Sequence, residues 1–166
     1  AGARGMAGNA ICKVLLENGY GESGGGKLLT PNRQELNLID GVSVKKWFDQ
    51  NNPTIVIIAA AKVGGILANS RYPTEFLLDN LKIQNNLIET AWQNQVKRLL
   101  FLGSSCIYPK FAKQPIKEDY LLSGGLEPTN EFYAIAKISG IKLCEALRRQ
   151  YQFDAISLMP TNLFGP

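Results

Sequence analysis

The feature that most constrains this chain is a set of short, uninterrupted apolar segments separated by long amphipathic ones. Residues 54–60 (TIVIIAA) and 98–103 (RLLFLG) are rich in β-branched and large apolar side chains. Such runs are typical of strands buried on both faces of a parallel sheet. Residues 155–159 form a third segment of this kind, and Lys27 to Thr30 is a shorter strand candidate.

Four intervening segments carry apolar residues at helical spacing. Residues 6–18, 42–50, 74–94 and 130–151 are the predicted helices, and Asn18-Gly19 supplies a stop for the first. Strands that alternate with helices predict right-handed βαβ units and an α/β fold with a doubly wound, Rossmann-like parallel sheet. Ligands of such sheets bind at the carboxyl ends of the strands, so the residues after each strand are the candidate site.

Composition narrows the class of protein. A chain of 166 residues with 45% hydrophobic and 19% charged residues fits one globular domain, residues 1–166.

No apolar run reaches roughly 20 residues and no signal segment is visible, which predicts a soluble, cytoplasmic protein without a membrane partner. Cys12, Cys106 and Cys144 are widely spaced and the chain has no histidine. A reducing compartment and no metal site are therefore expected.

The formal charge of +4 does not indicate a nucleic-acid partner. The lysines and arginines are scattered and form no basic run. A bound anionic cofactor or nucleotide is the better use of a mild positive excess.

A glycine-rich turn leads directly into the first predicted helix. Gly2, Gly5 and Gly8 form a Gly-x-x-Gly-x-x-Gly pattern. Glycines there allow tight backbone geometry and let amides approach a pyrophosphate, which the positive helix end also favours. This predicts a dinucleotide site, with an ordinary glycine-rich loop as the alternative. A second glycine run, residues 24–26, predicts a flexible loop.

Two arginines favour NADP(H) over NAD. Arg4 lies in the turn, and Arg33 follows the second strand candidate, where NAD enzymes place an acidic residue for the ribose hydroxyl. Guanidinium groups suit a 2′-phosphate because their planar donors engage oxygens in pairs. The alternatives are solvated surface charges and, for Arg33, a helical ion pair with Glu35.

A serine, a tyrosine and a lysine follow in the order that carbonyl reduction needs. Ser104 comes after the strand that ends at Gly103, and Tyr133 and Lys137 lie one turn apart on the next helix. A nearby ammonium should lower the high pKa of the tyrosine, and the serine can orient a carbonyl oxygen. A half-buried tyrosine beside a surface lysine is the alternative.

Four segments resemble the GDP-L-fucose synthase family of the extended short-chain dehydrogenases/reductases. They are AAAKVGG at 59–65, LGSSCIYP at 102–109, EPTNE at 127–131 and MPTNL at 159–163, and the likeness covers nearly the whole chain. The resemblance implies an NADP-dependent oxidoreductase that epimerises GDP-4-keto-6-deoxy-D-mannose at C3 and C5 and reduces its C4 ketone. It also implies a homodimer.

The resemblance assigns roles to individual residues. Tyr133 would be the proton donor to the C4 oxygen, Lys137 its activator and a cofactor ligand, Ser104 a carbonyl partner, and Cys106 an acid-base residue for epimerisation. A thiol with a reference pKa near 8.5 can act in either form, whereas a buried free cysteine is the alternative. The cofactor set implied is Gly2, Ala3, Arg4, Gly5, Met6, Ala7, Gly8, Arg33, Leu102, Gly103, Ser104, Ser105, Lys137, Pro160, Thr161, Asn162 and Leu163.

Two rivals remain. One is another nucleotide-sugar epimerase or dehydratase of the same superfamily, against which Cys106 and the arginines argue. The other is a non-catalytic, dinucleotide-binding redox-sensing module, which typically lacks the tyrosine and lysine. The turn at Ala1-Gly2 would need a preceding strand, and the family pairs its cysteine with a downstream histidine. We therefore expect a fragment that lacks the first strand and a C-terminal substrate domain.

Overall fold

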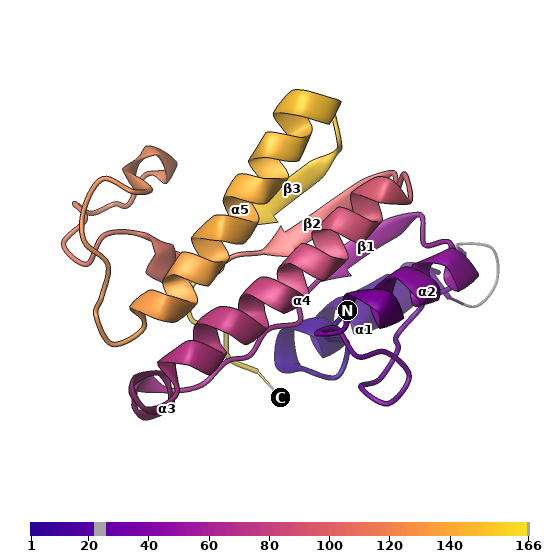
Figure 1. The fold of residues 1–166 in the computed structure, drawn as a ribbon, viewed down its shortest axis with the longest axis horizontal. Helices are drawn as coiled ribbons and strands as arrows, with labels where there is room; N and C mark the ends of the chain where they lie inside the picture. Colours follow the sequence, from indigo (N-terminus) through magenta and orange to yellow (C-terminus); the bar gives the residue numbers. More distant parts are fainter. Residues whose placement is uncertain (22–25, 166) are drawn as a thin grey trace.

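The computed structural model describes residues 1–21 and 26–165. Most of the glycine-rich stretch expected to be a flexible loop, residues 22–25, lies outside them. Three strands form one sheet in the order β1 (Ile55–Ile58), β2 (Arg98–Leu102) and β3 (Ala155–Leu158). Both pairs are parallel, with Ile57 opposite Leu100 and Leu100 opposite Ile156. The predicted α/β fold with a parallel sheet is confirmed (Figure 1).

The four predicted helices form within one or two residues of their expected bounds. They are α1 (Met6–Glu17), α2 (Gly41–Asn51), α4 (Pro73–Gln93) and α5 (Glu131–Tyr151). Pro73 opens α4, where its missing N–H costs nothing, and the Asp40 carboxylate accepts the Val42 N–H at the start of α2. Three short elements were not predicted: α3 (Ile66–Arg71) and the 3₁₀ turns at Ser105–Ile107 and Glu118–Tyr120.

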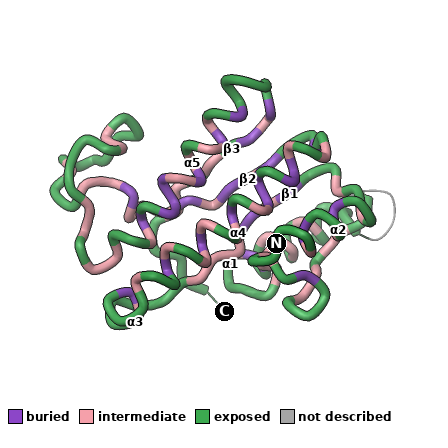
Figure 2. Tube along the Cα trace, viewed as in Figure 1, coloured by how far each residue is buried: buried purple, intermediate pink, exposed green. Residues whose placement is uncertain are grey.

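The core lies between the sheet and one layer of helices. α4 and α5 run side by side across the sheet, and α2 packs beside α4 (Figure 1). The buried residues gather on the strands and on the helix faces turned toward them (Figure 2). The cluster includes Val56, Ile58, Leu99 and Phe101 of the sheet, Leu87, Ile88 and Ala91 of α4, and Cys144 and Leu147 of α5.

Burial of the strands is one-sided, so the expectation of strands buried on both faces is wrong. Val56, Ile58, Leu99 and Phe101 are buried, whereas their neighbours in β1 and β2 are only half-buried or exposed. The alternation follows from the packing, because α4 and α5 cover the face from which the four buried side chains project.

The strand expected at Lys27 to Thr30 does not form; these residues are extended but unpaired. A cavity of about 640 Å³ lies between them and β1, and Leu28, Leu29, Val56 and Ile57 all line it. A strand requires a neighbouring edge with which to exchange backbone hydrogen bonds, and within the described residues this segment has none in reach.

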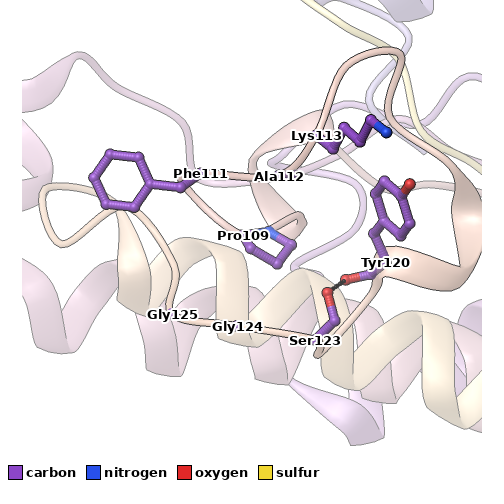
Figure 3. A pocket seen from close by; sticks show the side chains of 8 residues that line it. All are labelled: Pro109, Phe111, Ala112, Lys113, Tyr120, Ser123, Gly124 and Gly125. Atoms are coloured by element: carbon purple, nitrogen blue, oxygen red, sulfur yellow. Dashed lines mark hydrogen bonds between the residues drawn. The ribbon is translucent and has the colours of Figure 1, made fainter.

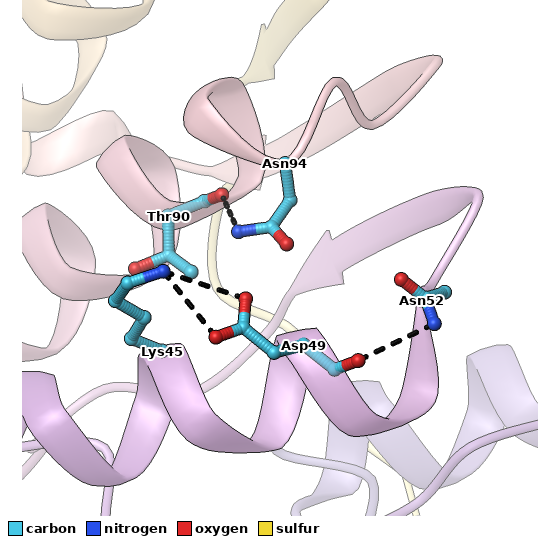
Figure 4. A network of polar contacts seen from close by, with 5 residues as sticks. All are labelled: Lys45, Asp49, Asn52, Thr90 and Asn94. Atoms are coloured by element: carbon cyan, nitrogen blue, oxygen red, sulfur yellow. Dashed lines mark hydrogen bonds and ion pairs between the residues drawn. The ribbon is translucent and has the colours of Figure 1, made fainter.

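Polar side chains form hydrogen bonds and an ion pair near the C-terminal ends of the two helices that precede β1 and β2 (Figure 4). At the end of α2, Lys45 pairs with Asp49 at 3.3 Å, and the Asn52 amide donates to the Asp49 carbonyl at 3.3 Å. At the end of α4, the Asn94 amide donates to the Thr90 carbonyl at 3.0 Å. The Asn52 amide satisfies a carbonyl that the end of α2 leaves open, whereas the Asn94 amide gives the Thr90 carbonyl a second donor beside the Asn94 N–H.

Candidate active site

Four loops meet at the carboxyl ends of the strands. The Ala59 N–H, just after β1, donates to the Ala1 carbonyl at 3.0 Å, which holds the glycine turn beside this strand end. The Gly103 N–H donates to Leu158 O at 2.7 Å, and the Ser105 N–H to Pro160 O at 3.1 Å. The loops after β2 and β3 are therefore held against each other.

The glycine turn has the shape that an anion-binding turn requires. Gly2 has φ +86°, and a Cβ there would lie 2.6 Å from Ala60 N, while a Cβ on Gly8 would collide with the Gly2 carbonyl oxygen. A Cβ on Gly5 would meet only that oxygen, at 3.5 Å. No side chain caps α1, and its first turn holds no acidic residue. The first N–H groups of α1 thus suit a phosphate.

We expect Gly8→Ala to lower the free energy of unfolding by about 3 kcal/mol, the upper end of overpacking costs, because the added methyl meets backbone on the opposite side of the turn. Gly5→Ala in the same turn is the matched control and should cost less than about 1 kcal/mol, since only an N-cap preference is lost. Urea unfolding curves measure both. Equal stabilities of the two variants would contradict the close approach.

Arg4 and Arg33 lie exposed in two separate turns. Arg33 is not helical, and the Glu35 carboxylate accepts the Asn32 N–H at 2.7 Å. No ion pair joins Arg33 to Glu35 in residues 1–21 and 26–165. The alternative of a helical Arg33–Glu35 pair is therefore wrong, and a role for both arginines at a 2′-phosphate stays a prediction.

Lys137 is buried, with 4% of its surface exposed, and is held from two sides. Its Nζ donates to the Leu102 carbonyl at 2.7 Å and lies 4.7 Å from the centre of the Phe101 ring. Burial lowers the pKa of Lys137 to about 8, against an opposing attraction from Cys106. At neutral pH the group is a cation placed at the end of β2. The alternative of a surface lysine is wrong.

Tyr133 lies one turn before Lys137, with its ring centre 5.8 Å from Nζ. Burial, followed by the proximity of Cys106, raises the pKa of Tyr133 to about 12. The expectation that the lysine lowers this pKa is wrong, because loss of solvation dominates and the ammonium is engaged by the Leu102 carbonyl. At neutral pH the tyrosine is a phenol, the form that donates a proton.

Cys106 lies between these groups and Ser104. Burial raises the pKa of the Cys106 thiol, while a hydrogen bond with Ser104 and the charge of Lys137 act in the opposite direction. The Ser104 hydroxyl also accepts the Cys106 N–H at 3.5 Å, within the 3₁₀ turn. The structure thus brings Ser104, Cys106, Tyr133 and Lys137 together, and Cys106 is a protonated thiol at neutral pH.

The other predicted cofactor residues lie at different distances along the chain from the four candidate catalytic residues, at the strand ends, at the start of α1 and in the loop after β3. Leu102 and Gly103 adjoin the lysine, and Pro160 holds Ser105 through its carbonyl. Met6 and Ala7 open α1. Thr161, Asn162 and Leu163 are exposed in the loop after β3. Their contacts with a cofactor remain a prediction.

Sequence reasoning missed a buried amide that shapes the loop after β1. Asn80 of α4 has 2% of its surface exposed; its Oδ1 accepts the Lys62 N–H at 2.8 Å and its Nδ2 donates to the Lys62 carbonyl at 3.0 Å. The Lys62 ammonium pairs with Asp79 at 2.8 Å. A polar residue on the apolar stripe of the predicted helix was the available signal.

A shallow cavity of about 390 Å³ lies in the segment that follows the cysteine turn (Figure 3). Pro109, Lys113 and Tyr120 are among its lining residues, and the Phe111 side chain points away from them (Figure 3). It is formed within residues 109–125 and includes none of the four candidate catalytic residues. Among the described residues, no cluster of three metal-ligating side chains occurs, and no helix could span a membrane.

Known proteins resemble this chain in sequence and in fold. The chain is 55% identical over its whole length to GDP-L-fucose synthase 1 of Arabidopsis thaliana and to GDP-L-fucose synthase of Escherichia coli K12. It spans about half the length of these curated relatives, 50% in each case. A GDP-mannoheptose C4 reductase from Campylobacter jejuni, solved with NADP bound, is 38% identical with a TM-score of 0.92, covering 99% of this chain and 47% of that one.

The sequence profile of the NAD dependent epimerase/dehydratase family matches residues 1–166. Together with the parallel sheet, the glycine turn, and the pairing of half-buried Tyr133 with buried Lys137, this match places the chain in the NAD-dependent epimerase/dehydratase family.

Proposed function

We propose that this chain is the cofactor-binding part of a GDP-L-fucose synthase, which epimerises GDP-4-keto-6-deoxy-D-mannose at C3 and C5 and reduces it at C4. The observation that carries the proposal is the grouping of Cys106 with Tyr133 and Lys137 at one strand end. The 55% identity to curated synthases over the whole chain supports it. We further propose a cytoplasmic homodimer.

The cofactor we propose is NADPH, which supplies the hydride for C4 reduction when bound. The glycine turn fits its pyrophosphate, because Gly2 and Gly8 leave no room for side chains and the first N–H groups of α1 are uncapped. Lys137 would hold the nicotinamide ribose from the end of β2. Arg4 and Arg33 would engage the 2′-phosphate.

The side chains of this chain divide the proton chemistry between them. A C4 ketone acidifies the hydrogens at C3 and C5, so epimerisation needs a base that removes each hydrogen and an acid that returns a proton to the opposite face. The Cys106 thiol would be the acid, and the downstream histidine with which the family pairs its cysteine would be the base. Reduction leaves negative charge on the C4 oxygen, to which the Tyr133 phenol would give its proton. Ser104 would orient that oxygen, and the Lys137 cation would stabilise the charge.

The test uses a protein of the relatives' full length that contains this sequence, hereafter the full-length enzyme. It is incubated with NADPH and GDP-4-keto-6-deoxy-D-mannose, and the product is identified by NMR. Formation of GDP-L-fucose supports the proposal. A C4-reduced product without inversion at C3 and C5 would show a reductase alone, and a tightly bound NAD that is returned unchanged would favour the rival epimerase or dehydratase.

Replacing Arg4 and Arg33 together by alanine should weaken binding of NADPH much more than binding of NADH, because only NADPH carries the 2′-phosphate. A loss of about 1.5–3 kcal/mol per charged hydrogen bond is the expected scale. Fluorescence titration of the full-length enzyme with each cofactor measures the difference. Arg71→Ala, at the exposed end of α3, is the control. Equal weakening of both cofactors would reject the phosphate role.

A further inference from the structure

The helix α4 carries a second buried amide, Gln84, whose partner lies on α5. Gln84 has 2% of its surface exposed. Its Nε2 donates to the carbonyl of Ala136 at 2.6 Å, and the two residues are 52 positions apart in the chain. Ala136 directly precedes Lys137. The bond therefore ties the middle of α4 to the turn of α5 that carries the candidate lysine.

The same amide lies at the closest approach of three elements. A Cβ on Gly140, one turn beyond Ala136, would lie 2.9 Å from Gln84 Cδ and 2.6 Å from Cζ of Phe101 in β2. Gly140 thus lets α5 sit directly on the Gln84 amide and on the Phe101 ring. That ring lies 4.7 Å from Lys137 Nζ. Gln84 and Phe101 together set the depth at which α5 rests on the sheet.

The position of α5 relative to the sheet affects Lys137, because both the side chain of Lys137 and the backbone next to it are held by hydrogen bonds. Its Nζ reaches the Leu102 carbonyl at 2.7 Å, while its backbone is adjacent to the carbonyl that Gln84 holds. Ala136 lies inside α5, so its carbonyl keeps the Gly140 N–H as its helix partner when the Gln84 donor is lost. Loss of the Gln84 amide therefore removes the bond that ties α5 to α4, and α5 becomes free to shift across the sheet. Such a shift would change the position of Lys137 Nζ relative to β2.

We propose that Gln84 is a positioning residue for hydride transfer, which acts by holding Ala136 so that Lys137 stays on the Leu102 carbonyl. Gln84 lies under α5 and contacts no reacting atom. This inference rests on the proposed function, since it assumes that Lys137 takes part in the reduction.

The test is a double-mutant cycle in the full-length enzyme with Gln84→Met and Lys137→Met. Methionine keeps the length and volume of glutamine but cannot donate to Ala136. The control is Gln93→Met, the same change on the same helix at an exposed position, where the amide donates only to Glu89. The single-turnover rate of NADPH oxidation and the KM for the sugar nucleotide are measured, together with urea unfolding midpoints.

We expect Gln84→Met to lower the hydride-transfer rate on the order of tenfold, because small misplacements of reacting groups cost rate, and to change the KM less than about twofold. In the Lys137→Met background, Gln84→Met should have no further effect on the rate. Gln84→Asn keeps the amide but is one methylene too short to reach Ala136. It should behave like Gln84→Met, and it serves as the second variant if Gln84→Met does not fold.

Three results would overturn the inference. A rate for Gln84→Met equal to that of Gln93→Met would show that the bond does not position the site. Multiplying effects in the double variant would show that Gln84 acts independently of Lys137. A normal rate for Lys137→Met alone would overturn this inference together with the catalytic role of the lysine, which separates failure of the proposed mechanism from failure of the positioning alone.

Discussion

Tyr133→Phe is expected to abolish reduction of the C4 ketone and to leave NADPH binding nearly intact. Burial keeps the phenol protonated at neutral pH, with a pKa of about 12, so the side chain is suited to give a proton to the C4 oxygen. Phenylalanine keeps the ring and its packing and removes only that proton. Loss of a general acid costs a rate factor of roughly 10²–10⁴.

Single-turnover oxidation of NADPH by the full-length enzyme measures the chemical step, and fluorescence titration measures cofactor binding separately. Tyr151→Phe is the matched control, because Tyr151 lies exposed at the other end of α5, where the Gln150 amide donates to its hydroxyl. Normal turnover by Tyr133→Phe would remove the tyrosine from the mechanism. Loss of NADPH binding would assign it to the cofactor instead.

The sequence predicted the sheet and the main helices because both depend on local periodicity. Val56 and Ile58 in β1, and Leu87, Ile88 and Ala91 in α4, all fall in segments predicted from apolar spacing and are buried. The segment at Lys27 to Thr30 has the composition of a strand but pairs with no neighbour, and composition does not report the presence of a partner edge. The one-sided burial of β1 was not predicted either. It depends on which face of the sheet the helices cover, and that is a tertiary contact.

The grouping of the four candidate catalytic residues was predictable from the sequence, but their protonation states were not. Spacing placed Tyr133 and Lys137 on one face of a helix, and the order of the loops brought Ser104 and Cys106 to the same strand end. The protonation states follow from burial, which one sequence does not give. Lys137 of α5 is buried with its Nζ donating to the Leu102 carbonyl, and this contact leaves the phenol of Tyr133 without the expected lowering of its pKa.

The buried amides of α4 show what periodicity misses. Asn80 and Gln84 fall on the stripe that apolar residues otherwise occupy, and each bonds to backbone far away in the chain, at Lys62 and at Ala136. Their partners depend on tertiary contacts with the loop after β1 and with α5. The loop after β1 holds the glycine turn through Ala59, and α5 carries Tyr133 and Lys137, so each buried amide fixes a segment beside the candidate site.

Cys106→Ser is expected to block epimerisation at C3 and C5 while leaving the hydride machinery in place. Burial raises the pKa of the thiol, so in the proposed mechanism Cys106 would act as a proton donor. Serine has nearly the same size but is a far weaker acid. The proton that inverts each carbon should therefore no longer be delivered, whereas Tyr133 and Lys137 keep their places on α5.

Solvent deuterium incorporation at C3 and C5 of the sugar, followed by NMR, measures epimerisation, and NADPH oxidation with a substrate already epimerised measures reduction. We expect exchange at both carbons to fall by roughly 10²–10⁴, the usual contribution of a general acid or base, with reduction kept within about tenfold. Cys12→Ser, on α1 and outside the Cys106 turn, is the control for loss of a thiol. Undiminished exchange at both carbons would make Cys106 a bystander. Loss of exchange and reduction together would instead indicate that the thiol supports Tyr133, whose pKa its proximity already raises.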